Sequence, residues 1–178
     1  MSTALDRRRR RTVAALAAAV GLGLLASAPA QAGAGTSALC TVSFPSVLIA
    51  PAFQPLALTA SAGTMTSEGH TGTVRCAGEI RGHAVTGAGT AAIRYERWGT
   101  CAGHVGEGDV EWKVPTDGGL QVLAGELSVR RLAVAILAAA DFGDARADLA
   151  GALYPVEGDC VLTPLSRVGV LVAGSLVT

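Results

Sequence analysis

Small or apolar residues alternate with polar ones over residues 71–114, a stretch of more than forty residues. Around Cys76, the apolar side of the chain carries Val74 and Ile80, whereas the other side carries residues such as Arg75. Further along, Glu107, Asp109, Glu111 and Lys113 alternate with small or apolar residues in the same way. A period of two predicts half-buried β-strands. The register is fixed as well, because a slip by one residue would carry every charge into the core.

The same criterion predicts several further strands. The predicted strands are Leu39–Phe44, Gly72–Gly82, Val85–Trp98, Glu107–Val114, Leu120–Arg131, Ala145–Tyr154 and Val161–Val177. Asp117-Gly118-Gly119 is a hairpin signal between two of them. Three prolines, Pro45, Pro51 and Pro55, predict an edge or a loop crossing, because proline removes a donor from the strand ladder. The last strand contains so few polar residues that we expect it to be buried on both faces.

The segment Leu132–Ala140 is ambiguous between a short buried helix and a strand, because it is continuously apolar and rich in alanine. We favour a continuation of the preceding strand, since Val134 and Ile136 are β-branched and no N-cap residue precedes them.

Eight or nine antiparallel strands at this spacing predict an all-β fold, either a barrel or a two-sheet β-sandwich. Glycines within the strands permit tight curvature and close approach of neighbouring strands, so the antiparallel barrel is favoured over the sandwich. An outer-membrane barrel is disfavoured, because the expected outer face is charged and charges that face lipid are costly. Those charged residues are Arg75, Glu79, Arg81, Arg94, Glu96, Glu107, Asp109 and Glu111.

Residues 1–32 are expected to be a signal peptide. A run of five arginines, Arg7 to Arg11, precedes an apolar stretch, and Ala30-Gln31-Ala32 matches a cleavage site. The apolar run is only about 14 residues, short of the roughly 20 that span a bilayer, so stable membrane insertion after cleavage is not expected. Residues 33–37 then form a flexible lead-in, and residues 38–178 form a single barrel-like domain.

Removal of the signal peptide changes the charge of the chain. Taking five arginines and Asp6 from 14 basic and 14 acidic residues leaves 9 and 13, a net charge of about −4. A nucleic-acid partner is therefore not expected. The mature protein is expected to be secreted, and its partner to be a small apolar ligand or a cell-surface component.

All four cysteines, Cys40, Cys76, Cys101 and Cys160, fall in the part expected to be exported, which predicts two disulfides. Three pairings are open. We favour Cys76 with Cys101, which closes a short loop, and Cys40 with Cys160, which joins the two ends of the domain.

The cysteine-centred segments carry a resemblance. Residues 40–44 (CTVSF), 72–78 (GTVRCAG), 99–108 (GTC followed by three spaced glycines) and 158–160 (GDC) make the chain similar to uncharacterised secreted β-rich proteins of actinobacteria. The resemblance covers the mature chain and implies neither an activity nor a cofactor.

Candidate chemistry is sparse. His70, His83 and His104 show no metal-ligand spacing, and each lies beside glycine in an expected loop, where a solvated histidine is the ordinary outcome. Two clusters of carboxylates could bind calcium or serve glycosidase chemistry: Glu107, Asp109 and Glu111 on one strand face, and Asp141, Asp144 and Asp148 near a turn. The first group fits the outer face of a strand beside Arg94 and Arg97 better, and the second lacks EF-hand spacing. No catalytic residue, metal ligand or cofactor site is predicted.

The aromatic residues leave one ligand-binding candidate. Tyr95, Trp98, Trp112 and Tyr154 are too few for an obvious sugar platform. Trp112 alternates with core positions, which leaves Trp98, in an expected turn, as an exposed stacker. We therefore expect a secreted, non-catalytic binding or structural module. The alternatives are a carrier of a small apolar ligand inside the barrel and a secreted hydrolase whose carboxylates converge in three dimensions.

Overall fold

The computed structural model describes residues 36–178. The predicted signal peptide, residues 1–32, and residues 33–35 of the predicted lead-in lie outside the described residues. Strand β1 begins at Ser37, the last residue of the predicted lead-in. Within the described residues, no helix is long and apolar enough to cross a membrane.

Strands account for all the regular secondary structure of the described residues, and every named pairing is antiparallel. The strands are β1 (Ser37–Phe53), β2 (Ser61–Thr66), β3 (Gly72–Ile80), β4 (His83–Ala84), β5 (Gly89–Thr100), β6 (Gly103–Thr116), β7 (Gly119–Leu132), β8 (Ala135–Asp141), β9 (Arg146–Glu157) and β10 (Leu165–Val177). The predicted all-β class is confirmed.

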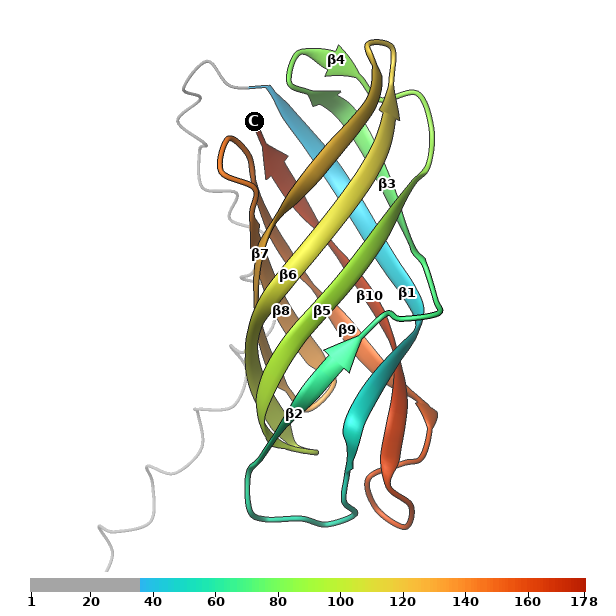
Figure 1. Cartoon of the computed structure of the whole chain (residues 1–178), viewed down its shortest axis with the longest axis vertical. Coiled ribbons are helices and arrows are strands. Elements are labelled where there is room, and N and C mark those ends of the chain that lie inside the picture. Colours follow the sequence, from blue (N-terminus) through green and yellow to red (C-terminus); the bar gives the residue numbers. More distant parts are fainter. Residues whose placement is uncertain (1–35) are drawn as a thin grey trace, which may run out of the picture. The chain divides into compact units, whose positions relative to one another are not determined.

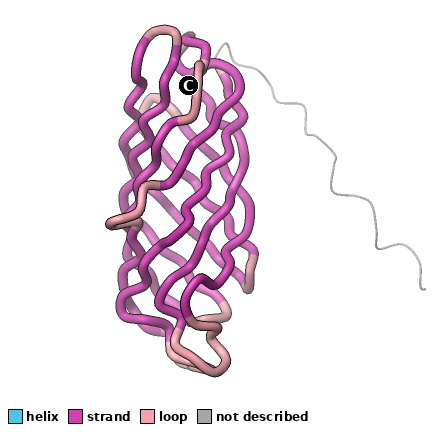
Figure 2. The backbone as a smooth tube through the Cα atoms, turned by 90° about the vertical axis from the view of Figure 1, so that its right-hand side faces the viewer, coloured by secondary structure: helices cyan, strands magenta, loops and turns pink. Residues whose placement is uncertain are grey.

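Eight of these strands close into a ring. Following the pairings, β1 joins β3, then β5 to β10 in chain order, and β10 returns to β1. Short strand β2 pairs with β1 and β5 beyond the start of β3, and β4 folds back on the end of β3 (Figure 1). Figure 2 shows the crossed front and back walls of the ring. The predicted barrel is confirmed, and the two-sheet alternative is wrong.

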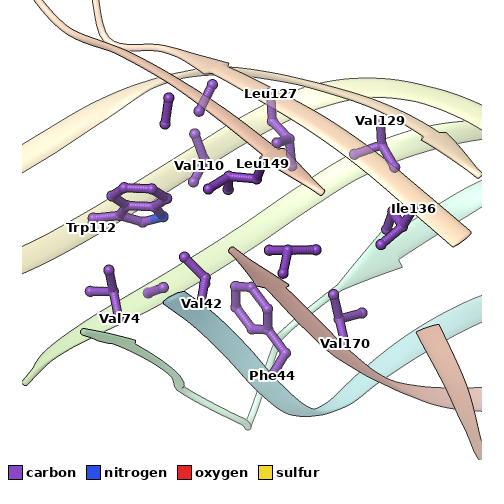
Figure 3. Packing of buried hydrophobic residues seen from close by; sticks show 14 of the residues in the cluster. Val42, Phe44, Val74, Val110, Trp112, Leu127, Val129, Ile136, Leu149 and Val170 are labelled. Atoms are coloured by element: carbon purple, nitrogen blue, oxygen red, sulfur yellow. The ribbon is translucent and has the colours of Figure 1, made fainter. Parts of the chain in front are cut away.

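The predicted alternation of side chains is what fills the barrel. Residues of the same parity point inward from each strand, as Val110, Trp112 and Val114 do from β6. Their charged neighbours on β6 point to the outside. In Figure 3, Trp112 and Phe44 lie among branched aliphatic side chains from several strands. Burial of these apolar side chains on one face is the main force that closes the sheet.

Turns lie at both ends of β7, and the second one sets the direction of the apolar segment that follows. The predicted hairpin at Asp117-Gly118 joins β6 to β7 as expected. Residues 135–140 are extended, as favoured, but they do not continue the preceding strand. The chain turns at Ala133 and Val134, where Ala133 adopts a positive φ of 53°, and then returns as β8. Alanine gives no sequence signal for such a turn.

The proline-containing segment was predicted as an edge or loop, which holds for Pro55, in the turn after β1, but is wrong for Pro45 and Pro51. Strand β1 continues through Pro45 and Pro51 to Phe53, and at Leu48 it pairs with β10 on one side and with β2 on the other. The pairing of β1 with β10 shifts between Phe44 and Val47, so the missing donor of Pro45 falls in an irregularity of the ladder. Strand β10 also differs from expectation, because Leu171 on its outer face is half exposed.

Two disulfides are present and no cysteine is free, but the favoured pairing is wrong. Cys40 bonds to Cys76, its direct partner on the neighbouring strand, with Cα atoms 4.0 Å apart. Cys101, in the β5–β6 turn, bonds to Cys160 in the β9–β10 loop. Cys76 and Cys101 lie toward opposite ends of the barrel, separated by the length of β5, roughly 35 Å of strand. Both bonds fit an oxidising, extracellular-type environment.

Candidate binding site in the barrel interior

The middle of the barrel contains a small apolar cavity of about 40 Å³. Its walls come from seven of the eight ring strands, so no single strand builds it. The lining residues are Val42, Phe44, Ile93, Tyr95, Val110, Trp112, Leu127, Val129, Ile136, Ala138, Ala140, Leu149, Val170 and Val172. Almost all of this wall is hydrocarbon, and an apolar cavity of this kind stays free of water.

Below this cavity, toward the β5–β6 turn, the interior becomes polar. Tyr95 and Arg97 point inward from β5, His104 from β6 and Arg131 from β7. His104 and Arg131 are direct cross-strand partners, and Arg97 pairs with Gly106 on β6 and Gly63 on β2. A Cβ atom at Gly63 would lie 2.7 Å from a guanidinium nitrogen of Arg97. The glycine therefore leaves the space that the arginine head group occupies.

Arg97 is 2% exposed and hydrogen-bonds to two other strands, β1 and β2. From β5, its Nη2 donates to the carbonyl oxygen of Pro51 in β1. Its Nη1 lies 3.3 Å from the carbonyl oxygen of Ser61, at the start of β2. The guanidinium carbon lies 3.9 Å from the centre of the Phe53 ring, a cation–π contact. The remaining donor, Nε, is buried and has no partner within the described residues.

Arg131 and His104 are each partly satisfied. Arg131 is 8% exposed, and its Nε donates to the carbonyl oxygen of Ala133 at 2.7 Å, while its Nη1 has no partner within the described residues. His104 is 4% exposed, and its Nε2 lies 3.3 Å from the hydroxyl of Tyr95. The Nδ1 of His104 is buried without a partner in the same part of the chain. The Tyr95 hydroxyl also donates to the sulfur of Met65 at 2.9 Å.

This cluster carries positive charge and contains no acid. Among the described residues, no aspartate or glutamate is buried, and neither Arg97 nor Arg131 forms an ion pair. Burial lowers the pKa of both arginines. Burial, reinforced by the charges of Arg131 and Arg97, lowers the pKa of His104 to about 4, so this imidazole is neutral at pH 7. Burial likewise raises the pKa of Tyr95 above its usual value of 10.0.

The three histidines have different positions from those expected. His70 and His83 are exposed, as predicted. His104 was expected to be solvated in a loop, and this is wrong, because it is an inward-facing residue of β6. Residues 36–178 contain no group of three or more His, Cys, Asp or Glu side chains placed to hold a metal ion.

The two carboxylate groups lie on the outside of the barrel. Glu107, Asp109 and Glu111 share the outer side of β6, as predicted. Asp109 is the direct neighbour of Arg94, but Arg97, which was expected beside these carboxylates, points inward.

The second group, Asp141, Asp144 and Asp148, lies at the β8–β9 turn and the start of β9. There Asp144 pairs with Arg81 at 2.8 Å. Arg146 bridges to Asp148 at 3.1 Å. Exposed, ion-paired carboxylates differ from the desolvated acid that a glycosidase uses.

A shallow outer hollow does bring carboxylates from several strands together. It is lined by Glu107, Asp109, Glu126 and Asp141, with Arg146 at its border. These side chains are open to solvent, and none of them is buried. Nothing in their surroundings would make one carboxyl group a general acid and another a general base.

Trp98 and Trp112 occupy the two faces of adjacent strands. Trp112 is 1% exposed and packs against Phe142, with ring centres 5.3 Å apart. Trp98 is 57% exposed, but it lies in β5 rather than in a turn. It borders an open hollow on the outer surface, together with Val105, Arg130 and Leu137.

Sequence reasoning missed the interior cluster, although the signal was present. Arg94 and Arg97 were both assigned to the outer face, yet an odd difference in position places two residues of a regular strand on opposite faces. The same parity places His104 with Trp112 on β6 and Arg131 with Val129 on β7. That assignment followed the charge of the side chain and not its place in the alternation, because charged residues are seldom buried.

Fold and site together define a class: a closed eight-stranded antiparallel barrel with an apolar centre and a cationic end in its interior. Comparisons with protein-family models, curated proteins and solved structures found no match for this chain.

Proposed function

We propose that the protein is a secreted, non-catalytic binding protein that holds a small apolar ligand inside its barrel. The observation that carries this proposal is the cavity in the barrel interior, whose walls are hydrocarbon from nearly every ring strand. An apolar guest in such a cavity removes its own surface from water at about 25 cal/mol per Å².

The size of the cavity limits the ligand. Pockets for drug-sized ligands have volumes of roughly 300–1,000 Å³, whereas this cavity has about 40 Å³. The guest is therefore a few carbon atoms in size, or the inward side chains move to admit a longer one. Alanines at two wall positions, Ala138 and Ala140, leave the space.

Secretion rests on two features. The sequence of residues 1–32 predicts a signal peptide, and both disulfides need an oxidising compartment. The resemblance to secreted β-rich proteins of actinobacteria agrees with this location and remains part of the proposal.

The hydrolase alternative lacks a comparable feature. The carboxylates that line the outer hollow are solvated, whereas acid–base pairs in hydrolases are held in contrasting environments. A structural module without a ligand is the other reading, and it is the outcome if the cavity proves unable to bind.

Native mass spectrometry of protein purified from culture medium tests location and cargo together. We expect a chain that begins near Gly33 and carries both disulfides, accompanied by a small apolar molecule that organic solvent extracts. A titration with neutral alkyl alcohols of increasing length then measures binding through the fluorescence of Trp112, which lines the cavity. The variant Trp98→Phe removes the exposed indole from the signal. If Trp112 emission is unchanged with every alcohol and no molecule is extracted, the binding function is contradicted and a structural role is indicated.

A further inference from the structure

Two guanidinium groups are enclosed at one end of the barrel without a negative charge. Arginine stays protonated in proteins, so Arg97 and Arg131 cannot relieve their burial by losing a proton. Buried charges are normally paired, and an unpaired one destabilises the fold. Within residues 36–178, every ion pair lies on the outside, and the interior provides no carboxylate.

Three unpartnered nitrogens belong to this same cluster: the donors Arg97 Nε and Arg131 Nη1, and Nδ1 of His104, which carries a hydrogen in only one of the two neutral tautomers. They come from three adjacent strands, β5, β6 and β7, and all three side chains point inward. Arg131 and Arg97 each also lower the pKa of His104, which places both guanidinium groups within electrostatic reach of this imidazole. A buried water could accept from these donors, but water brings no negative charge.

A purely structural role explains part of the arrangement. Arg97 ties β1 and β2 to β5 through Pro51 and Ser61, and Arg131 holds the Ala133 carbonyl of the β7–β8 turn. Those contacts use one side of each guanidinium. They do not explain why two positive charges and a histidine converge where an apolar core would be more stable.

We propose that the cationic end of the barrel, defined by Arg97, His104 and Arg131, binds an oxyanion such as a carboxylate or phosphate group. The unsatisfied guanidinium donors, Arg97 Nε and Arg131 Nη1, supply charge-assisted hydrogen bonds to its oxygens. The interior cavity borders Tyr95 but not His104 or Arg131, so the anion takes its place as the long arginine side chains shift.

Tyr95 connects this site to the apolar cavity. Its ring lines the cavity, while its hydroxyl lies 3.3 Å from His104. An amphiphile could therefore place its head group at the arginines and its alkyl chain among the apolar wall residues. In that form the inference builds on the proposed function, whereas a free anion would bind independently of it.

Thermal unfolding of the mature protein tests the site with acetate and phosphate as probes. Ionic strength is held constant with a bulky, hydrophilic anion. A ligand that binds only the folded state raises the unfolding temperature with its concentration. We expect acetate or phosphate to raise it for the wild-type protein. A transition that depends on ionic strength alone would overturn the proposal and indicate that water satisfies the cluster.

Arg131→Met and Arg130→Met form a matched pair. Arg130 is the next residue on β7 and points outward. We expect Arg131→Met to weaken anion binding at least tenfold, measured by calorimetric titration, and Arg130→Met to leave it unchanged. Equal affinities in the two variants would contradict the assignment. If Arg131→Met fails to fold, Arg131→Lys retains the charge without the planar fork, and we expect its affinity to lie below that of wild type.

Octanoate, acetate and octanol separate this site from the apolar cavity. Octanoate binding more tightly than both would support one amphiphile that uses the two regions. Acetate binding equally well as octanoate, with no octanol binding, would support the anion site while overturning the proposed carrier function. Octanol binding without any response to the carboxylates would retain the carrier and overturn the anion site.

Discussion

Trp112 and Trp98 are the residues that most directly report which face of the wall is the inside. Trp112 lies in the core beside Phe142, and Trp98 lies on the outer surface of the adjacent strand. Replacing a buried indole leaves a cavity, so we expect Trp112→Ala to lower the free energy of unfolding by about 3 to 5 kcal/mol.

Trp98→Ala is the matched control, and we expect it to cost less than about 1 kcal/mol, as surface substitutions usually do. Urea denaturation of both variants makes the comparison. A larger loss for Trp98→Ala than for Trp112→Ala would reverse the two faces of the barrel wall.

His104 gives the stability of the fold a pH dependence. Its pKa is about 4 in the folded protein and 6.5 in the unfolded chain, because burial and the charges of Arg131 and Arg97 oppose the imidazolium. Between these values the unfolded chain binds a proton that the folded protein does not. Stability is therefore complete above about pH 7 and falls by about 2 to 4 kcal/mol as the pH is lowered to 4.

We expect His104→Gln to flatten this part of the stability profile. The measurement is urea denaturation from pH 7 to pH 4 in buffers without added oxyanions. Asp144 and Asp159 have lowered pKa values, so their contributions are lost only below about pH 4. If the stability of His104→Gln depends on pH as steeply as that of the wild-type protein, another group is responsible for the pH dependence.

The burial of a single residue was predictable where its apolar or polar character agreed with the face that the alternation gives it. Val110, Trp112 and Val114 are apolar and share a parity, so their burial followed from the pattern. Arg97, His104 and Arg131 share the inward parity but are of polar type. A strand places side chains by backbone geometry alone, and alternation therefore held even where it buried a charge.

At the scale of elements, the disulfides tie two different kinds of neighbour. Cys40–Cys76 links adjacent strands, whereas Cys101–Cys160 links two loops at one end of the barrel. Trypsin cleaves after arginine and lysine, and its sites separate all four cysteines. Under non-reducing conditions we expect the peptide that ends at Arg75 to be linked to residues 76–81, and residues 98–113 to be linked to residues 147–167.

Mass spectrometry before and after reduction identifies these linked peptides, and titration of the denatured protein should find no free thiol. A link between residues 76–81 and 98–113 would instead restore the pairing favoured from the sequence. Each disulfide is expected to contribute about 2 to 4 kcal/mol to stability. A variant that lacks both Cys101 and Cys160 should therefore unfold at lower urea concentration.

Strand existence was easier to predict than strand connection. Alternation identified β3, β6, β7 and β9, because one face of each strand is buried and the other is wet. The turn at Ala133 carries no Gly, Asn or Asp signal, and the prolines of β1 argued against a strand that packing nevertheless retains. The disulfide pairing depends on which strands are neighbours, and sequence separation does not contain that information.

At the scale of the whole molecule, the ring closes because the two strands that would be its edges, β1 and β10, pair with each other. An open sheet would leave β1 and β10 with unpaired donors and acceptors, and their pairing from Ser37↔Val177 to Phe53↔Leu165 removes that edge. Alternating patterns predicted the strands and their inner faces. The preference for a barrel over a sandwich was based on the glycines within the strands. These glycines lack a Cβ atom and so allow neighbouring strands to approach closely.

Filling the interior cavity separates a binding role from a packing defect. Ala140 is buried and lines the cavity, whereas Ala139 on the same strand borders only outer hollows. Ala140→Val adds apolar volume in a residue suited to strands, and we expect it to stabilise the protein by up to about 1 kcal/mol. The same change should weaken alkyl alcohol binding at least tenfold, because guest and side chain compete for one space. Ala139→Val should alter neither urea denaturation nor the Trp112 fluorescence titration by a comparable amount. If Ala140→Val binds the alcohols as tightly as wild type, the ligand lies elsewhere, and the cavity is only a gap in the core.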